Sequence, residues 1–274
     1  MVERGVGFAQ AARDLDLHVN VLRKWGAGAG YRPAAGGSIA SPRGQVPIAR
    51  LPWRANRAED RTRMRKPRSV QSAETFGRIR LSRTFFMRDF LYSEIGNVHG
   101  LYNMPDDPDL AIEAGRKLCV TLLEPLQDTF GRLAIRSAYR SPEINDLGNK
   151  RYKSCARNET DRAKHIWDQR SDDGGMGAMT SVVVPWLVDW LSNGRSWTSM
   201  AWWIHDHLPY SELQFFPKLN AFNIGWHEVP RRRISSFASP RGLLTKPGMA
   251  NHSGDHSSEY VGFPTLVARS EMQS

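Results

Sequence analysis

Cysteine is scarce in this 274-residue chain, and long apolar runs are missing from it. Two cysteines, Cys119 and Cys155, are too few for a disulfide framework or a cysteine-rich zinc module. No stretch of 18 apolar residues occurs, so the sequence predicts no membrane span. The first 24 residues are polar and hold no apolar segment, so no signal peptide is expected. We therefore expect a cytoplasmic protein by default.

Positive charge is confined to one stretch of the chain. The formal net charge is +10, and residues 26–83 hold 13 Lys/Arg against 3 Asp/Glu, which accounts for the whole excess. Residues 26–80 are also rich in Gly, Ala, Pro, Ser and Arg without a sustained period, which predicts a disordered basic linker. The basic composition therefore gives no information about the larger, electrically balanced part.

Regular patterns return at Leu81, and we expect one folded domain over residues 81–244 with an irregular tail over 245–274. An amphipathic helix begins near Asp106 and ends near Pro125, and Ser141-Pro142 marks the start of another helix. The remaining expected elements are strands at 133–139, 180–184, 212–216 and 223–228 and helices at 185–191 and 196–207. This order predicts an α+β fold with a mainly antiparallel sheet and flanking helices.

The first 25 residues form a separate pattern of two short helices, 8–15 and 19–25. The spacing is that of a helix-turn-helix, and the segment resembles the N-terminal helix-turn-helix of insertion-sequence transposases. That resemblance implies DNA binding through Asn20, Arg23 and Lys24 on the second helix. A transposase-related DNA-binding protein is therefore one functional alternative.

Histidines concentrate in the balanced domain, where six of the eight follow residue 160. His165 and Asp172 are seven residues apart, and His227 ends an aromatic strand that would hold a ligand stiffly. Neutral imidazoles and carboxylates that converge, with one position left open, are the requirement for a catalytic zinc site.

The segment LLEPLQDTFGRLAIRSAYRSPEIN resembles the zinc D-Ala-D-Ala carboxypeptidase and L-alanyl-D-glutamate endopeptidase family, which shares the Hedgehog-like fold. The likeness covers about residues 81–230 and includes Tyr139-Arg140-Ser141-Pro142, then His165 and Asp172, then Trp226-His227. The resemblance implies that His165, Asp172 and His227 ligate zinc. It also implies that Arg140 stabilises the oxyanion or a substrate carboxylate.

One departure from the family concerns proton transfer. The family has a catalytic Glu where this chain has Phe216, and Phe cannot move a proton. Asp168, His205 and Glu228 are the candidate substitutes, although Glu228 directly follows a strand ligand and is expected to point to the opposite face. Peptide hydrolysis and metal-stabilised binding without catalysis therefore both stay open.

The leading expectation is a bacterial or phage-type zinc peptidase-like domain that cuts or binds peptidoglycan-type peptides. Phage-type delivery to the cell wall would bring it to that substrate. The alternatives are a DNA-binding protein of transposition acting through residues 1–25, and a metal-stabilised binding module without catalysis.

Overall fold

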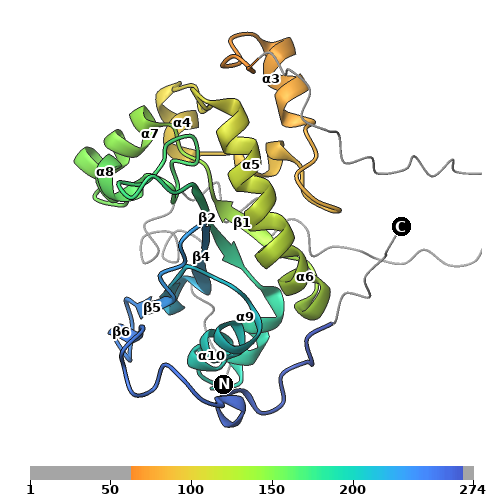
Figure 1. Ribbon diagram of the computed structural model, residues 1–274, viewed down its shortest axis with the longest axis vertical. Coiled ribbons are helices and arrows are strands. Elements are labelled where there is room, and N and C mark those ends of the chain that lie inside the picture. The colour runs from red at the N-terminus through yellow and green to blue at the C-terminus, as the bar shows by residue number, and fades with distance from the viewer. Residues whose placement is uncertain (1–62, 268–274) are drawn as a thin grey trace, which may run out of the picture. The chain divides into compact units, whose positions relative to one another are not determined.

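A six-stranded mixed sheet organises the part of the chain that the computed structural model describes, residues 63–267 (Figure 1). Its order is β1-β2-β4-β3-β5-β6, and every neighbouring pair is antiparallel except β3 and β5, which are parallel. The strands are β1 (Ala134–Ser137), β2 (Gly177–Val183), β3 (Glu212–Phe216), β4 (Ala221–His227), β5 (Arg233–Ser236) and β6 (Gly242–Thr245). The expected α+β class with a mainly antiparallel sheet is therefore confirmed, and the Hedgehog-like topology stays a prediction.

Helices lie before β1, between β1 and β2, and between β2 and β3. They are α3 (Val70–Gly77), α4 (Glu94–His99), α5 (Pro108–Leu118), α6 (Glu124–Phe130), α7 (Pro142–Leu147), α8 (Asn158–Asp161), α9 (Pro185–Ser192) and α10 (Thr198–His207). Ser141 caps α7 by accepting a hydrogen bond from the backbone N–H of Ile144, as its sequence predicts. No helix in the described residues is both long and apolar enough to cross a membrane.

The longest helical run packs against the sheet and continues further than its sequence suggested. Asp107 caps α5, which contacts β2 and β4, and one π-helical turn then leads into α6. The helix was expected to end near Pro125, but it continues to Phe130. Pro125 lies in the first turn of α6, and the change in helical pitch at the π turn accommodates a residue that has no N–H to donate.

The last part of the expected linker is folded. Ser69 caps α3 by accepting a hydrogen bond from the N–H of Ser72, and Phe76 on this helix is buried in the core. Lys66 forms an ion pair with Asp106, with its Nζ 2.8 Å from the carboxylate. The prediction of disorder is therefore wrong for residues 63–80, because apolar and charged side chains there find partners distant in sequence. Residues 26–62 lie outside the described part.

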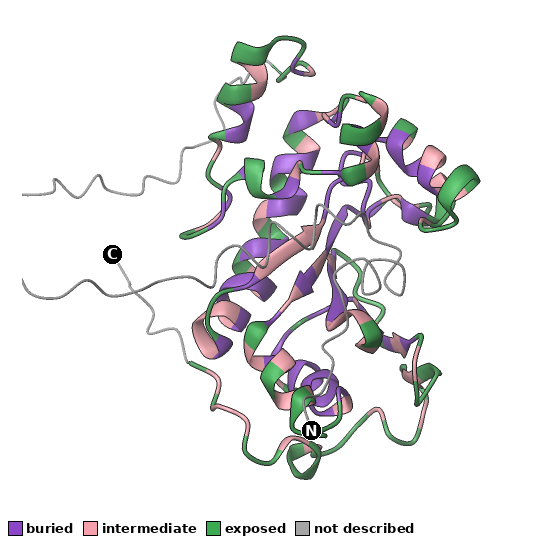
Figure 2. Ribbon diagram, turned by 180° about the vertical axis from the view of Figure 1, so that it is seen from behind, coloured by how far each residue is buried: buried purple, intermediate pink, exposed green. Residues whose placement is uncertain are grey.

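The two faces of the sheet differ in character, although its central strands β2 and β4 are buried along most of their length (purple in Figure 2). Strands β3 and β4 alternate, so that Leu213, Phe215 and Ile224 enter the apolar core. Antiparallel partners point to the same side of a sheet, so Glu212 and His227 share the opposite face. One face therefore builds the core, and the other presents polar groups.

The segment 246–267 has little regular structure but is not loose. Its 3₁₀ turn η5 (Ser257–Tyr260) contacts α10, and Trp203 donates a hydrogen bond from its indole N–H to the carbonyl of Pro264 at 3.1 Å. Phe263 packs edge-on against Phe130 and Trp186. The expected irregular tail is thus a strap over the aromatic core of α9 and α10.

Candidate functional site

A small surface pocket lies on the polar face of the sheet, where β4 ends and β2 and β3 begin. Its lining includes three cationic side chains, one carboxylate and one imidazole, contributed by Arg162, Lys164, Arg231, Glu212 and His227. Glycines keep the space around the imidazole free. A Cβ at Gly175 would lie 2.6 Å from Cε1 of His227, and a Cβ at Gly177 would lie 2.8 Å from its Cδ2.

His227 is held by a short chain of hydrogen bonds. Its Nε2 lies 2.8 Å from the hydroxyl oxygen of Ser171, and that hydroxyl donates to Oδ1 of Asp173 at 2.5 Å. The backbone N–H of Val229 donates to Nδ1 at 3.0 Å. Hydrogen bonds from Ser171 and from the N–H of Gly175 hold the pKa of Asp173 below its ordinary value. The imidazole is therefore fixed in orientation beside a carboxylate that stays ionised.

The opposite wall of the pocket is an ion-pair group centred on Glu212. Its Oε2 lies 3.0 Å from Nζ of Lys164, and its Oε1 lies 3.1 Å from a guanidinium nitrogen of Arg231. Sequence analysis missed Glu212, although the alternation of β3 carried the signal. Because Glu212 pairs with Gly225, two residues before His227, strand periodicity places both side chains on one face.

His165 is buried, and its neutral ring could act as a metal ligand or as a hydrogen-bond acceptor. Its Nδ1 lies 2.8 Å from the carbonyl oxygen of Ala138. Burial, followed by the positive charge of Arg140, lowers the pKa of His165 well below its ordinary value. The neutral ring thus donates from Nδ1, and within residues 63–267 no hydrogen-bond partner occupies Nε2.

Arg140 is engaged in a buried ion pair and does not line the pocket. One guanidinium nitrogen lies 3.0 Å from Oδ2 of Asp161, and another lies 2.7 Å from Sγ of Cys155. Burial raises the pKa of Asp161, and the charge of Arg140 opposes that rise. The expected oxyanion role of Arg140 is not supported, because its charge is neutralised by a partner 21 residues further along the chain.

The structure does not bring together the expected zinc ligands His165, Asp172 and His227. Asp172 is 84% exposed and turns to Arg162, with 3.6 Å between the charged groups. Its neighbour Asp173 is the carboxylate near His227, with 3.8 Å between Oδ1 and Nε2. In the described residues, these three expected ligands do not lie within 4.8 Å of one another. The expected donor set therefore does not fit a zinc ion in this arrangement.

The three expected substitute bases are also placed elsewhere. Asp168 accepts a hydrogen bond from the N–H of Asp106 at 2.7 Å, and burial raises its pKa. Glu228 accepts from the N–H of Met176 at 2.7 Å and pairs with Arg170, with 3.4 Å between the charged groups. His205 lies on α10, where Nδ1 is 2.7 Å from the hydroxyl of Tyr210. None of these three residues lines the pocket.

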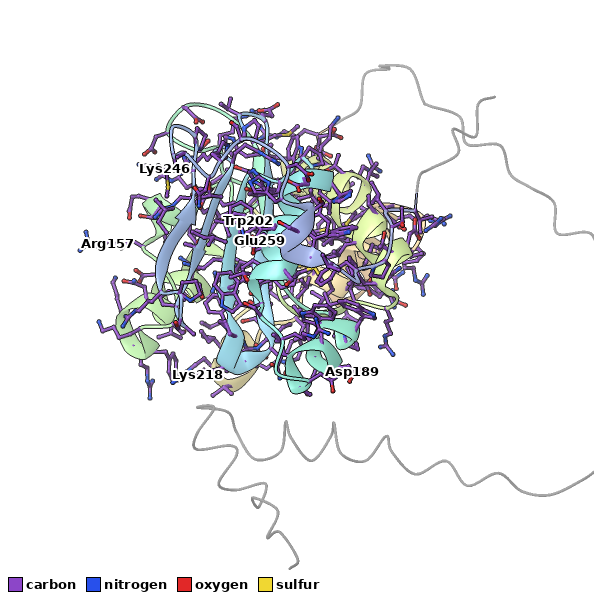
Figure 3. The ribbon with its side chains drawn as sticks, turned by 90° about the horizontal axis from the view of Figure 1, so that it is seen from below. Arg157, Asp189, Trp202, Lys218, Lys246 and Glu259 are labelled. Atoms are coloured by element: carbon purple, nitrogen blue, oxygen red, sulfur yellow. The ribbon has the colours of Figure 1, made fainter. Side chains whose placement is uncertain are left out.

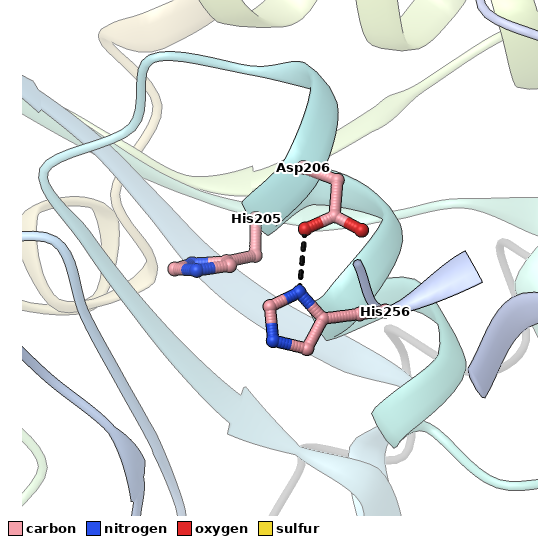
Figure 4. Close-up of side chains that lie close together, drawn as sticks. All are labelled: His205, Asp206 and His256. Atoms are coloured by element: carbon pink, nitrogen blue, oxygen red, sulfur yellow. Dashed lines mark hydrogen bonds and ion pairs between the residues drawn. The ribbon is translucent and has the colours of Figure 1, made fainter. Parts of the chain in front are cut away.

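A second cluster could hold a metal ion. His205, Asp206 and His256 offer ligand atoms that all lie within 4.8 Å of one another (Figure 4). Nδ1 of His256 lies 2.7 Å from Oδ1 of Asp206, and Nε2 of His205 lies 2.9 Å from the carbonyl oxygen of His252. Burial lowers the pKa of His205, so its ring is neutral near pH 7, which is the form that binds metal.

The DNA-binding residues Asn20, Arg23 and Lys24 lie outside the described residues. Comparison with protein-family models, curated proteins and solved structures finds no match to the chain. Both resemblances, to transposases and to zinc peptidases, therefore stay predictions.

Proposed function

We propose that the described part of the chain is a peptidase-like domain that binds peptidoglycan-type peptides in the pocket beside His227. The observation that carries this proposal is the pocket lining, which gathers cations, one carboxylate and a fixed imidazole on one face of the sheet. Peptidoglycan-type peptides carry free carboxylates. Charge-assisted hydrogen bonds to such groups are among the strongest polar contacts that proteins make.

Arg231 is the side chain best suited to meet a substrate carboxylate. It is half exposed, and only one of its nitrogens is taken by Glu212, at 3.1 Å. A guanidinium carries five N–H donors in a planar fork, so it can keep this contact and still bind a second carboxylate. Arg162 lies on the same pocket, with its charge only loosely paired to Asp172.

Hydrolysis, the stronger version of this proposal, depends on groups that the pocket itself holds. His227 and Glu212 are the titratable side chains of the lining that could exchange a proton with a bound peptide. A zinc-dependent step in the pocket lacks its expected third ligand, because the carboxylate of Asp172 pairs with Arg162. We therefore propose peptide binding as the function of the pocket, and cleavage is tested on the same peptides.

Zinc is the cofactor that we propose for the chain, at the cluster of His205, Asp206 and His256. Imidazole nitrogens and carboxylate oxygens are ligands that zinc prefers. The donors of the cluster come close together, whereas those of the expected triad do not. A zinc ion at this cluster would be bound by α10 and by the segment after β6, which do not line the pocket. We therefore propose no catalytic role for it.

The proposal is tested by calorimetric titration with an acetylated pentapeptide that ends in two D-alanines, beside the same peptide as its C-terminal amide. We expect the free acid to bind, and the amide and the Arg231→Ala variant to bind about 10-fold to 100-fold more weakly, the effect of one charge-assisted hydrogen bond. Mass spectrometry of the mixture shows whether D-alanine is released.

Arg233→Ala is the matched control, because Arg233 is an exposed arginine two residues away that does not line the pocket. Its affinity for the peptide should equal that of the wild type. Absence of binding at millimolar peptide, or equal weakening by both substitutions, would remove the basis for the pocket as the peptide site.

A further inference from the structure

We propose that His205, Asp206, His252 and His256 form a zinc-class metal site that fastens the C-terminal strap, residues 246–267, onto α10. This inference rests on the proposed zinc binding, and it adds a fourth donor and a structural role. His205 and Asp206 come from the end of α10, whereas His252 and His256 come from the strap. The metal would therefore join two segments that are 50 residues apart in sequence.

His252 lies beside the cluster of His205, Asp206 and His256, whose ligand atoms are within 4.8 Å of one another, and its ring would have to turn toward them to serve as the fourth ligand. Its ring centroid lies 4.8 Å from that of His205, and the ring of His256 lies 5.2 Å from the same imidazole. The Nδ1 of His252 lies 3.2 Å from the hydroxyl of Thr245, which leaves Nε2 as its ligand atom. Three imidazoles and one carboxylate match the nitrogen and oxygen ligands of four-coordinate zinc.

The hydrogen bond between His256 and Asp206 brings two of the donors close to the separation that a zinc ion requires. Nδ1 of His256 lies 2.7 Å from Oδ1 of Asp206, a distance at which the ring N–H donates to the carboxylate. Ligand atoms about 2.0 to 2.1 Å from a tetrahedral zinc lie roughly 3.3 Å apart, so the metal would replace that proton after a shift of about half an ångström. His205 would likewise exchange the carbonyl of His252 for the metal at Nε2.

The surrounding side chains already orient these donors. Tyr260 donates its hydroxyl hydrogen to Oδ2 of Asp206 at 2.9 Å, and this contact fixes the carboxylate from the side that His256 leaves free. The indole of Trp202 stacks on the ring of His256, with the centroids 4.3 Å apart and an interplanar angle of 11°. Outer contacts of this kind are what hold metal ligands in place in established sites.

The strap covers the region that the metal would fasten. Trp202 on α10 and Glu259 on η5, both labelled in Figure 3, belong to elements that contact each other. A bond that joins segments so distant in sequence restricts the unfolded chain more than a local contact does. Zinc binding should therefore stabilise the strap against local opening as well as the domain against unfolding.

The test uses the full chain, dialysed against buffer with zinc and against buffer with a chelator. Elemental analysis counts zinc in the wild type, Asp206→Asn and His256→Gln, with His207→Gln as the matched control. His207 lies on the same helix, and its Nδ1 is 2.8 Å from the carbonyl oxygen of Trp203. We expect about one zinc per chain in the wild type and the control, and at least tenfold weaker zinc binding in the two variants.

Hydrogen exchange of the strap amides supplies the second readout. Zinc should slow exchange over residues 246–262 in the wild type and leave it unchanged in Asp206→Asn. If either variant fails to fold by circular dichroism, His252→Gln takes its place, because the one side-chain hydrogen bond of its ring among the described residues goes to Thr245. Peptide titration of Asp206→Asn should match the wild type, which separates this site from the pocket.

Three results would overturn the inference. If the wild-type protein binds no zinc, both this site and the proposed zinc cofactor are refuted. Zinc that stays in Asp206→Asn and His256→Gln but is lost from His227→Gln places the metal in the pocket, which refutes the strap site while leaving zinc binding intact. Zinc bound at the cluster without any change in strap exchange refutes the fastening role.

Discussion

Replacing Arg140 by Met should destabilise the domain strongly, because it leaves the carboxylate of Asp161 buried without its partner. The two side chains are 12% and 5% exposed, and their charged atoms lie 3.0 Å apart. Removing one partner of a buried ion pair costs about 3–5 kcal/mol. Urea unfolding followed by the fluorescence of the nine tryptophans measures the loss as a lower midpoint at an unchanged slope.

The same variant has a predictable pH dependence. Burial raises the folded-state pKa of Asp161 above its unfolded value of about 3.9, so the folded state binds this proton more readily. The resulting stabilisation is present below the unfolded pKa and is lost as the pH rises through the folded pKa. Without Arg140 the folded pKa rises further. The difference between the wild type and Arg140→Met should therefore be largest near pH 7 and smaller near pH 5.

The double variant Arg140→Met with Asp161→Leu provides the control. Exchanging a whole buried ion pair for apolar residues of similar size is often neutral or stabilising. It should therefore recover most of the stability that the single substitution loses. A single variant that loses less than about 1 kcal/mol, or a double variant as unstable as the single one, would refute the assignment of Arg140 to a structural ion pair.

Three further substitutions test the fold around the pocket and the core. Gly177→Ala places a Cβ 2.4 Å from a backbone carbonyl oxygen and 2.8 Å from the ring of His227. It should cost about 1–3 kcal/mol in urea unfolding and weaken peptide binding, and an unchanged titration would contradict the pocket geometry. Glu124→Gln should cost about 1.5–3 kcal/mol at pH 7. Burial favours the protonated carboxyl, but hydrogen bonds from Ser82 and Thr84 outweigh it and lower the pKa, so this stabilisation is present above about pH 4.5 and is lost as the pH falls through the folded pKa. A cost that stays the same however far the pH falls below 4.5 would refute that reasoning. Leu122→Ala, at a fully buried position, should lower the free energy of unfolding by about 2–5 kcal/mol in thermal or urea unfolding. A loss below about 1 kcal/mol would contradict a rigidly packed core at this position, because it would mean that neighbouring side chains fill the cavity.

Local patterns predicted the central elements well. The alternation of residues 212–216 gave the bounds of β3 as the structure has them, and Ser141-Pro142 marked the start of α7. The strands β5 and β6 were missed because their sequences, RISS and GLLT, do not alternate apolar and polar residues. Residues 63–80 were misassigned because their composition is basic, whereas their order comes from contacts with the rest of the domain.

The candidate site was predicted less well, because side-chain direction on loops is not a local property. His227 was assigned to the end of its strand and lies there, within the pocket. Asp172 and Asp173 are neighbours of the same type, and the turn hydrogen bonds of Ser171 and Gly175 decide that Asp173 faces the histidine. No feature of the sequence distinguishes these two carboxylates.

The sequence by itself determined the class of the fold, the central strands and the chemical types available to a site, because these depend on residue spacing along one element. Only the tertiary structure decided which charges pair. Arg140 meets Asp161, and His256 meets Asp206 fifty residues away, through chain reversals that local propensity does not encode. The physical reason is that periodicity sets the face on which a side chain lies. Its partner depends on which element the topology brings to that face.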